Sequence, residues 1–566
     1  MIQRVTEHEI SPQKELLLLC ALIQINADAG ARIRALAEEG LDWAGLLVAA
    51  ADNGIAPLLC QRLCRWAGDA LPAVWRDQFR EEFATNVRRN LVLSAELLRI
   101  LAALDACGVR PTPYKGPVLA AQAHDDIALR QFADLDIIVP QAEILEAHRT
   151  LVDLAYAPVD SAGEPHASRQ IPGHYAYFSK VSGTFVELHT EATLRYSPVR
   201  LDLESLLARR EMISLADSRV RTFSAEDSLV LLAIHGSKHF WDRLGWIADI
   251  AALSQNSRGL DWELSLERAR SLGAERMVLL AAGLAHDLLE APLSNRVVTR
   301  VKQDIVARSL MEAIFRQFFA LHPVRFGVVS RFLFRARMCG AARNGVGYAI
   351  RLAVTPTEAD RNENPAASYF EPFYCVLRPL RLARLYGWRT RLPNLVSVAP
   401  KQELHTEVAQ KLLAFAEICP NDFVLDMLTD SGQLAILAAR EYATTGVGIV
   451  PHLQALVRAK IDAREQGVLK NVRFVERAFD EGPDVAAPSR ATIVFVCAGA
   501  LGDDAFRLRL EAAMSQGMRV VSIGGDNICW KPTREVRIEG RGGEVTMFRL
   551  WHAIPMARST FDIPTS

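Results

Sequence analysis

The chain has 566 residues, of which half are hydrophobic and 23% are charged, and its formal net charge is −1. This length exceeds what one hydrophobic core usually organises, so we expect two or three domains of ordinary globular composition. A net charge this close to zero gives no general attraction to nucleic acid or to an anionic membrane. No run of about 18 or more apolar residues occurs, so no membrane span is expected.

The cysteines and the first residues indicate a compartment. Nine cysteines are scattered along the chain without a CxxC pair, which favours a reducing cytosol over a disulfide framework. The first 15 residues are polar and lack the apolar centre of a signal peptide. We therefore expect a cytoplasmic protein.

Residues 12–105 show apolar positions at intervals of three and four, which predicts a series of helices. The predicted helices cover residues 15–25, 31–38, 43–53, 58–66 and 75–104. The last of them is charged on one side and rich in leucine towards its end, a pattern typical of core packing rather than of a ligand site. This helical block is expected to pack around the sheet formed by the segments that follow.

Residues 132–139 alternate between apolar and polar side chains, which predicts a strand with one buried face. Asp134 and Asp136 then point the same way, while Leu135 and Ile137 point into a core. Two carboxylates side by side repel each other, and a strand that keeps both usually binds a cation between them. Oxygen ligands of this kind select Mg²⁺ or Mn²⁺. The alternative is a solvated strand face with two unrelated acids.

Lys115 and Gly116 precede this strand and stand just before a helix-like segment over residues 118–123. A glycine beside a lysine offers free backbone N–H groups and a positive charge to a phosphate. Arg130 lies four residues before Asp134, where its guanidinium could meet a triphosphate or pair with an acid.

The order KG…R…DLDIIV resembles the uncharacterised bacterial nucleotidyltransferase family within the polymerase-β-like superfamily. That superfamily carries a Gly-Ser-type loop, a strand with Asp-x-Asp, and a third carboxylate on a neighbouring strand. Here Lys115-Gly116 stands where the wider superfamily has Gly-Ser or Gly-Gly, and the gap to Asp134 is longer. The uncharacterised family shares both departures, so they favour it over the other members.

A second predicted strand covers residues 184–189, and its alternation places Phe185, Glu187 and His189 on one face. The resemblance implies that Glu187 is the third metal-side carboxylate. The family more often has Asp at this position, and the longer Glu would bind the metal directly or through water. The alternatives are a surface acid on an edge strand for Glu187, and either a hydrogen-bonded structural role or a substrate contact for His189.

Ser224 and Asp227 predict a capping box that opens a helix. His235 and His239 then lie four residues apart on one face of this helix. The same spacing occurs in the HExxH motif of zinc proteases. Here Gly236 occupies the position of the general-base glutamate, so we reject a zinc-protease site.

The resemblance gives this helix a different role, through the family pattern HGxKHxWxRLxWxxD. In polymerase-β-like enzymes a helical segment after the catalytic sheet closes over the nucleotide, which implies that Lys238 and His239 contact phosphate or base. The alternative is a helix held in place by a buried Trp and an Arg243–Asp249 pair. The pattern is carried here by His235, Lys238, His239, Trp241, Arg243, Trp246 and Asp249.

Residues 260–350 are predicted to be helical, with arginines and phenylalanines interleaved over 316–337. Such a stretch touches a membrane surface or nucleic acid, or it is a solvated helix whose arginine stems cover apolar neighbours; we favour the second. Residues 355–367 read as a loop and 370–389 resemble the family's closing segment. The resemblance thus covers about 15–390, and 393–400 is the predicted linker.

The remaining residues alternate between strand and helix patterns, which predicts a parallel, doubly wound sheet. The run over residues 424–460 resembles the first half of a class I methyltransferase that binds S-adenosylmethionine. Helices are predicted over 403–418, 433–442, 452–466 and 503–515, and strands over 423–427, 445–450, 472–476, 492–496 and 519–523.

The cofactor loop of this second resemblance is incomplete. The family has Asp-x-Gly-x-Gly-x-Gly, of which Asp426 and Gly432 remain as candidate cofactor-binding residues, while Leu428 and Asp430 replace glycines. The bulk of Leu428 and the charge of Asp430 are expected to obstruct the cofactor. Val450 stands where the family has an acid for the ribose hydroxyls, and unpaired hydroxyls cost on the order of a few kcal/mol. We expect a degenerate methyltransferase fold.

The sequence therefore predicts an α+β, polymerase-β-like nucleotidyltransferase domain with extensive helices over residues 1–392, with its core at 105–255. An α/β, Rossmann-like methyltransferase domain follows over 401–566. In the first domain, Mg²⁺ or Mn²⁺ is expected between Asp134, Asp136 and Glu187.

The expected reaction moves a nucleotidyl group from a nucleoside triphosphate to the hydroxyl of an unknown small molecule or protein. Lys115, Arg130 and Lys238 would neutralise phosphate charge. One alternative is an S-adenosylmethionine-dependent methyltransferase whose N-terminal part recruits the substrate. Another is a scaffold in which both folds have lost their chemistry.

Overall fold

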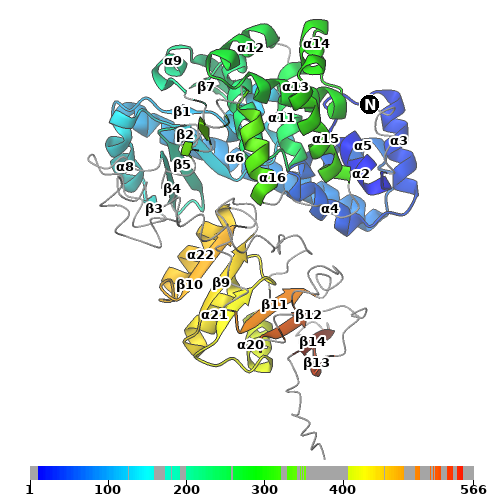
Figure 1. Ribbon diagram of the computed structural model, residues 1–566, viewed down its shortest axis with the longest axis vertical. Coiled ribbons are helices and arrows are strands. Elements are labelled where there is room, and N and C mark those ends of the chain that lie inside the picture. The colour runs from blue at the N-terminus through cyan, green and yellow to red at the C-terminus, as the bar shows by residue number, and fades with distance from the viewer. Residues whose placement is uncertain are drawn as a thin grey trace, which may run out of the picture. The chain divides into compact units, whose positions relative to one another are not determined.

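The computed structural model divides the chain into two compact units, Met1–Arg391 (unit 1) and Leu392–Ser566 (unit 2), which are described separately (Figure 1). The predicted loop over 355–367, the closing segment over 370–389, the linker over 393–400 and most of the helix over 503–515 lie outside the described residues. The structure describes residues 10–124, 126–158, 173–179, 181–191, 199, 201–255, 259–319, 328–340, 345, 347, 348, 350, 351, 404, 406–450, 453–476, 491–497, 510, 514, 517–523, 532–539 and 545–551.

The first helices of unit 1 agree with the sequence prediction to within a few residues at their ends. Their starts are defined by side-chain caps, because Ser11, Asn26 and Asp42 each accept a hydrogen bond from the backbone N–H three residues on. They are α2 (Pro12–Ala21), α3 (Ala27–Glu38), α4 (Trp43–Asp52), α5 (Ala56–Trp66) and α6 (Ala73–Ala106).

The long helix α6 joins the two cores of unit 1. Phe79, near its start, is buried among the N-terminal helices, whereas Leu93, Leu97 and Leu104 are buried against the sheet. One continuous helix therefore fixes the helical part of unit 1 relative to its sheet. This confirms that the leucine stripe of α6 is core packing.

A five-stranded sheet forms the second core, in the order β1-β2-β5-β4-β3. Both predicted strands are present, and β2 pairs with β5 in parallel, while the other pairs are antiparallel. The strands are β1 (Thr112–Pro113), β2 (Asp134–Ile138), β3 (Ala157–Pro158), β4 (His174–Phe178) and β5 (Phe185–His189). Short helices connect and cover them: α7 (Gly116–Ala123), η1 (Ile127–Leu129), η2 (Gln141–Glu143) and α8 (Ile144–Asp153).

The later helices of unit 1 pack against the N-terminal ones, so that segments far apart in sequence share one core (Figure 1). Ser224 caps α10 by accepting the N–H of Asp227 at 3.3 Å, as the capping box predicted. The elements after the sheet are α9 (Leu203–Ala208), β6 (Glu211–Leu215), β7 (Ser218–Thr222), α10 (Ala225–Lys238), α11 (Leu244–Gln255), α12 (Trp262–Ser271), α13 (Glu275–Leu289), α14 (Asn295–Gln303), α15 (Ile305–Phe319) and α16 (Val328–Met338).

The arginine-rich helix α16 packs its side chains onto aromatic neighbours. The guanidinium carbons of Arg331 and Arg335 lie 5.5 and 4.8 Å from the centre of the Phe240 ring, and Phe334 contacts the same ring edge-on. These contacts agree with arginine stems that cover apolar side chains. Across the described residues, no helix is long and apolar enough to cross a membrane.

Unit 2 is built on a seven-stranded sheet in the order β10-β9-β8-β11-β12-β14-β13. The first five strands in this order are parallel, and the order reverses between β8 and β11, which confirms the predicted doubly wound sheet. The antiparallel strands β13 and β14 were not predicted. The elements are α20 (Thr406–Phe415), β8 (Phe423–Asp426), α21 (Gln433–Tyr442), β9 (Thr445–Val450), α22 (Leu453–Glu465), β10 (Val472–Glu476), β11 (Ile493–Cys497), β12 (Arg519–Ile523), β13 (Arg534–Glu539) and β14 (Val545–Trp551).

Candidate active site

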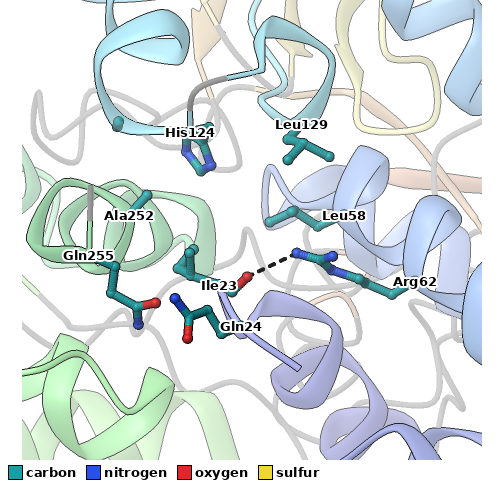
Figure 2. Close-up of a pocket in the computed structure, with 9 residues that line it drawn as sticks. Ile23, Gln24, Leu58, Arg62, His124, Leu129, Ala252 and Gln255 are labelled. Carbon is teal, nitrogen blue, oxygen red and sulfur yellow. Dashed lines mark hydrogen bonds between the residues drawn. The ribbon is translucent and has the colours of Figure 1, made fainter. Parts of the chain in front are cut away.

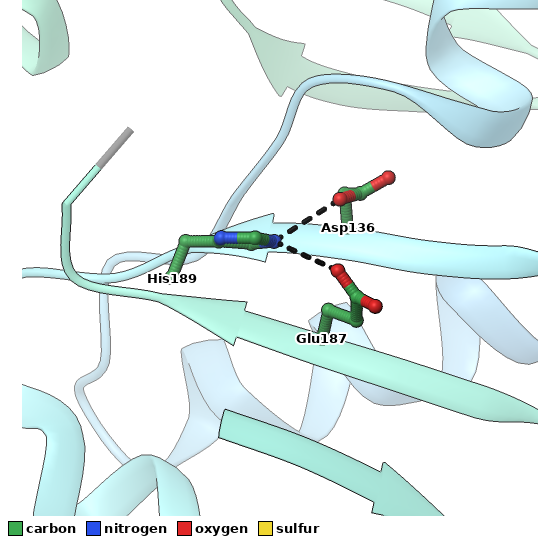
Figure 3. A group of neighbouring side chains, drawn as sticks. All are labelled: Asp136, Glu187 and His189. Carbon is green, nitrogen blue, oxygen red and sulfur yellow. Dashed lines mark hydrogen bonds and ion pairs between the residues drawn. The ribbon is translucent and has the colours of Figure 1, made fainter. Parts of the chain in front are cut away.

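Three side chains from β2 and β5 converge on one point of the sheet of unit 1 (Figure 3). Asp136, Glu187 and His189 each offer one ligand atom, and these atoms all lie within 4.8 Å of one another. The register explains the convergence, because Asp136 is the direct partner of Glu187 in the parallel pair. His189 follows Glu187 by two residues and therefore lies on the same face.

His189 lies between the two carboxylates. Its Nε2 is 3.0 Å from Oδ1 of Asp136 and 3.4 Å from Oε2 of Glu187. The Asp136 side chain is only 5% exposed, against 13% for Glu187 and 12% for His189. Two largely buried carboxylates repel each other strongly, so a cation is needed between them.

Lys115 contributes a second cation. Its Nζ lies 3.2 Å from Oδ1 of Asp136 and is largely buried. The neighbouring glycine makes this approach possible: Gly116 has φ +53°, and a Cβ there would lie 3.2 Å from the carbonyl oxygen of Asp134. Helix α7 therefore begins directly against β2, and its first turn brings Lys115 to the carboxylates.

The pKa values in this group are shifted by burial and by charge. Burial alone would raise the pKa of Asp136, but the charge of Lys115 and the hydrogen bond from His189 lower it below its ordinary value. Burial would likewise lower the pKa of Lys115 and of His189, but the neighbouring carboxylates raise both. The group therefore favours a charged Asp136 held by charged donors.

Asp134 does not belong to the three-residue group, as far as the described residues show. Its register partner is Phe185 rather than an acid. Its charge still acts nearby, since it helps to raise the pKa values of Lys115 and Arg130. A metal-binding role for Asp134 stays a prediction, and His189 takes the third place in the group.

Arg130 adopts the acid-pairing alternative that the sequence left open. Its Nε lies 2.9 and 3.2 Å from the two carboxylate oxygens of Asp249, and its Nη2 lies 3.1 Å from one of them. His124 Nε2 lies 3.1 Å from the same carboxylate. The hypothesis of an Arg243–Asp249 pair is wrong, because Arg130 occupies Asp249 while Arg243 lies over the ring of Trp246.

Two asparagines of α6, which the sequence analysis did not single out, hold the segment that carries Arg130. Asn86 Nδ2 donates to the carbonyl of Ala128 at 2.9 Å, and Asn90 Nδ2 donates to the carbonyl of Arg130 at 2.9 Å. Both asparagines are buried. In the sequence, these asparagines stand out only because they interrupt the apolar face of a long amphipathic helix. A buried asparagine must find a hydrogen-bond partner.

His235 and His239 form an aromatic cluster with Trp246, with ring centres 4.7 to 5.2 Å apart. Burial and the positive charges of neighbours, among them Lys115 and Lys238, hold the pKa of both histidines well below the ordinary value. Both imidazoles are therefore neutral near pH 7.

The end of α10 is fixed by packing. Trp241 is fully buried, and a Cβ on Gly236 would lie 2.7 Å from its ring, so Gly236 leaves the space that Trp241 fills. The carbonyl of Lys238 accepts a hydrogen bond from Arg335 at 2.9 Å. The buried Trp of the packing alternative is thus present, and this end of the helix lies near enough to Lys115 for their charges to act on the same histidines.

In unit 2 the two matching residues of the cofactor loop hold the loop together. The Asp426 carboxylate is fully buried and accepts the backbone N–H groups of Leu428, Thr429 and Leu434 at 2.9 to 3.0 Å. Gly432 has φ +67°, and a Cβ there would lie 2.7 Å from the ring of Phe474. Both residues are required by the local fold, whatever the loop binds.

Two expectations about this loop concern residues that lie in the core. The Leu428 side chain is 1% exposed and packs within the core of unit 2, and the expected obstruction of the cofactor by its bulk stays a prediction. Val450, at the end of β9, is fully buried among apolar side chains. It offers no acceptor for a ribose hydroxyl, as the sequence indicated.

One family model and several solved structures are similar to parts of the chain. Residues 39–290 match the model of a family described as uncharacterised nucleotidyltransferase. The match confirms the resemblance stated from the Lys115-to-Val139 stretch and contains both the convergent site and its basic neighbours. A search of curated proteins finds no significant match.

Several solved methyltransferases are similar to part of the chain. An RNA methyltransferase from Salinibacter ruber, in complex with S-adenosyl-L-homocysteine, is 25% identical and covers 27% of this chain and 97% of its own, with a TM-score of 0.22. An S-adenosylmethionine-dependent methyltransferase from Geobacter sulfurreducens is 22% identical and covers 25% of this chain and 55% of its own, with a TM-score of 0.18. The tRNA methyltransferase TrmK of B. subtilis is 14% identical, with coverages of 27% and 67% and a TM-score of 0.21.

Proposed function

We propose that unit 1 is a metal-dependent nucleotidyltransferase that moves a nucleotidyl group from a nucleoside triphosphate to a hydroxyl acceptor. One observation carries the proposal: Asp136 and Glu187 are register partners on adjacent parallel strands, and basic groups lie beside them. Carboxylates bind the divalent ions that accompany triphosphates, and nearby cations bind the phosphates themselves. The family match over residues 39–290 supports the same reaction class.

The donor set fits a divalent ion in two ways. With all three side chains, two carboxylates and one imidazole suit Mn²⁺, because nitrogen ligands are tolerated by that ion better than by Mg²⁺. With Asp136 and Glu187 alone, the set offers the oxygen ligands that Mg²⁺ prefers, and His189 then orients the carboxylates through hydrogen bonds. When bound, the ion would supply Lewis-acid stabilisation of the phosphoryl oxygens.

The side chains around the carboxylates bind the other parts of the nucleotide. Lys115 immediately precedes α7 and binds phosphate through its charge. The backbone N–H groups at the start of α7 bind the same phosphate. The neutral His235 and His239 hydrogen-bond to the sugar or base. Arg130 acts from a distance, because its guanidinium is already bound to Asp249 and its charge adds to the positive potential around Asp134 and Asp136.

The test is pyrophosphate release by the full-length protein from each nucleoside triphosphate with Mg²⁺ or Mn²⁺. Asp136→Asn and Glu187→Gln should each reduce the rate by roughly 10²–10³-fold, since they remove charge that acts on the transition state. Glu211→Gln is the matched control, because Glu211 is an exposed acid on β6 outside the site. Retained activity in Asp136→Asn would remove the proposal.

Metal binding can be measured without turnover. Titration of Mn²⁺ followed by electron paramagnetic resonance should show one site in the parent protein, weakened in Asp136→Asn and Glu187→Gln. Asp134→Asn separates the two possible roles of Asp134: weaker Mn²⁺ binding identifies a ligand, whereas normal Mn²⁺ binding identifies a residue that acts only through its charge.

For unit 2 we propose an accessory role on a methyltransferase-like fold. The buried Val450 at the end of β9 and the structural use of Asp426 and Gly432 support this proposal over catalysis with S-adenosylmethionine. An acceptor, whether a small hydroxylated molecule or a protein, would then be the partner that unit 2 helps to select.

A further inference from the structure

Unit 1 contains a cavity of about 170 Å³ that is separate from the carboxylate group (Figure 2). It lies where α5, the end of α7 and the end of α11 meet the residues that follow α2. Its apolar lining includes Leu58, Leu129 and Ala252, and its polar lining includes Arg62, His124 and Gln255.

Arg62 brings a positive charge to this cavity without a neutralising acid. Its Nη2 donates to the carbonyl of Ile23 at 3.1 Å, and its Nε is buried and has no hydrogen-bond partner. No carboxylate of the described residues lies within ion-pair distance of it, and the side chain is only partly exposed. A partly buried guanidinium normally has an anion beside it, because desolvation of an isolated charge is costly.

Other polar atoms of the cavity are also unused or placed to receive a ligand. The Oε1 of Gln255 is buried without a partner and is an acceptor, so this side chain can serve an anion only through its amide nitrogen. Gln24 is exposed where the cavity meets solvent. Figure 2 shows the side chains of Gln24 and Gln255 close together, with His124 and the Arg62 guanidinium around the same space. The cavity therefore offers one cation, amide groups and an apolar side.

The size of the cavity limits the ligand. Pockets for drug-sized molecules measure roughly 300–1,000 Å³, whereas one water occupies about 30 Å³. A cavity of about 170 Å³ excludes a nucleoside triphosphate and admits a small molecule with one charged group.

We propose that this cavity binds a small oxyanion, either a carboxylate or a phosphate group, with Arg62 as its counter-ion. The Arg62 guanidinium supplies the positive charge, and the amide nitrogens of Gln24 and Gln255 donate to the oxygens of the anion. The site is distinct from the proposed nucleotidyl-transfer site and does not depend on it.

An anion bound in this cavity lies close to residues that contact the Asp249–Arg130 pair. His124 lines the cavity and at the same time contacts Asp249, which holds Arg130. An anion in the cavity acts on the imidazole of His124 and so on the Asp249–Arg130 pair. Two residues, His124 and Asp249, then connect the ligand to Arg130, a cation whose charge reaches Asp136.

The test is calorimetry and thermal unfolding of the full-length protein with sodium phosphate or sodium acetate, against sodium chloride of equal ionic strength. One anion should raise the melting temperature in a saturable way through mass action, and the anion that does so identifies the ligand as a phosphate or a carboxylate. Arg62→Gln should weaken this binding at least tenfold. Arg65→Gln should leave it unchanged, because Arg65 lies on the same helix but is exposed and stacked on Trp66.

Ala252→Val provides a second variant that narrows the cavity without changing charge and should also weaken binding. It keeps the proposal testable if Arg62→Gln does not fold, as judged by circular dichroism. The absence of saturable binding by both anions would overturn the proposal, and so would equal binding by Arg62→Gln and Arg65→Gln in folded protein. Neither result bears on pyrophosphate release, which tests the proposed function separately.

Discussion

Arg130 binds Asp249 through its Nε and Nη2 at 2.9 to 3.2 Å, although the two residues are 119 positions apart in the chain. The pair joins the segment before β2 to α11, and its Asp249 carboxylate is 4% exposed. The first prediction concerns this buried pair.

Asp249→Asn should destabilise unit 1 by about 3–5 kcal/mol, because it leaves the Arg130 charge buried without its partner. Urea unfolding followed by tryptophan fluorescence measures the loss. Arg243→Gln is the control, since Arg243 matched Asp249 in the sequence pattern but does not pair with it. A loss in Arg243→Gln as large as that in Asp249→Asn would contradict the assignment.

Gly116→Ala should reduce both stability and pyrophosphate release. A side chain at φ +53° is strained by roughly 1–2 kcal/mol, and the new Cβ meets the carbonyl of Asp134 at 3.2 Å. Gly183→Ala separates the two effects, because Gly183 has φ +67° with no atom within 4 Å of its Cβ position. Thermal unfolding should show similar strain in both variants, while activity should fall only in Gly116→Ala. Equal activity in the two variants would mean that Gly116 does not position Lys115.

The buried histidines predict how stability depends on pH. The pKa values of His235 and His239 are lowered in the folded state, so the unfolded chain binds protons at these sites first as the pH falls below about 6.5. Their contribution to the free energy of unfolding is complete above that pH and decreases below it, by at most about 1.4 kcal/mol per pH unit for each histidine. His189 has the opposite sign, because its raised pKa adds stability below about 6.5 that is lost as the pH rises through the folded value.

The measurement is the pH slope of the unfolding free energy between pH 6.5 and 5.5. His239→Gln should make this slope less steep than in the parent protein, and it should leave the slope between pH 7.5 and 8.5 unchanged. An identical slope in parent and variant below pH 6.5 would show that His239 is not held neutral by its surroundings.

Asp426→Ala should loosen the loop between β8 and α21, because the N–H groups of Leu428, Thr429 and Leu434 lose their acceptor. Each unsatisfied buried donor costs on the order of 1–3 kcal/mol. Amide hydrogen exchange of the full chain should rise in residues 427–434 and stay unchanged in unit 1. Unchanged exchange in that loop would contradict a structural role for Asp426.

Calorimetry with S-adenosylmethionine should give no binding heat with the parent protein. The reason is the apolar Val450, which replaces an acceptor for the ribose hydroxyls. Binding of S-adenosylmethionine at micromolar concentration would favour the alternative that unit 2 is an active methyltransferase.

Local pattern was enough to predict most helices of unit 1 and most elements of unit 2, but of the seven strands described in unit 1 it predicted only β2 and β5. Strict alternation over residues 132–139 and 184–189 predicted β2 and β5, and the residues of unit 2 alternated between strand and helix often enough to predict its parallel sheet. The capping box at Ser224 predicted the start of α10. Strands β13 and β14 were not predicted. β13 is exposed and charged, whereas β14 is buried at Phe548, Leu550 and Trp551 and pairs with both β12 and β13.

The sequence by itself determined which acids share a strand face, because side-chain direction in a strand follows from position alone. Only the tertiary structure decided which acid meets which, since the register of β2 against β5 pairs Asp136 with Glu187 and leaves Asp134 beside Phe185. The same holds for Arg130, whose partner comes from a helix more than a hundred residues away. Charges attract any opposite charge that the fold brings near, so the choice between Arg130 and Arg243 as the partner of Asp249 depends on packing that no local spacing encodes.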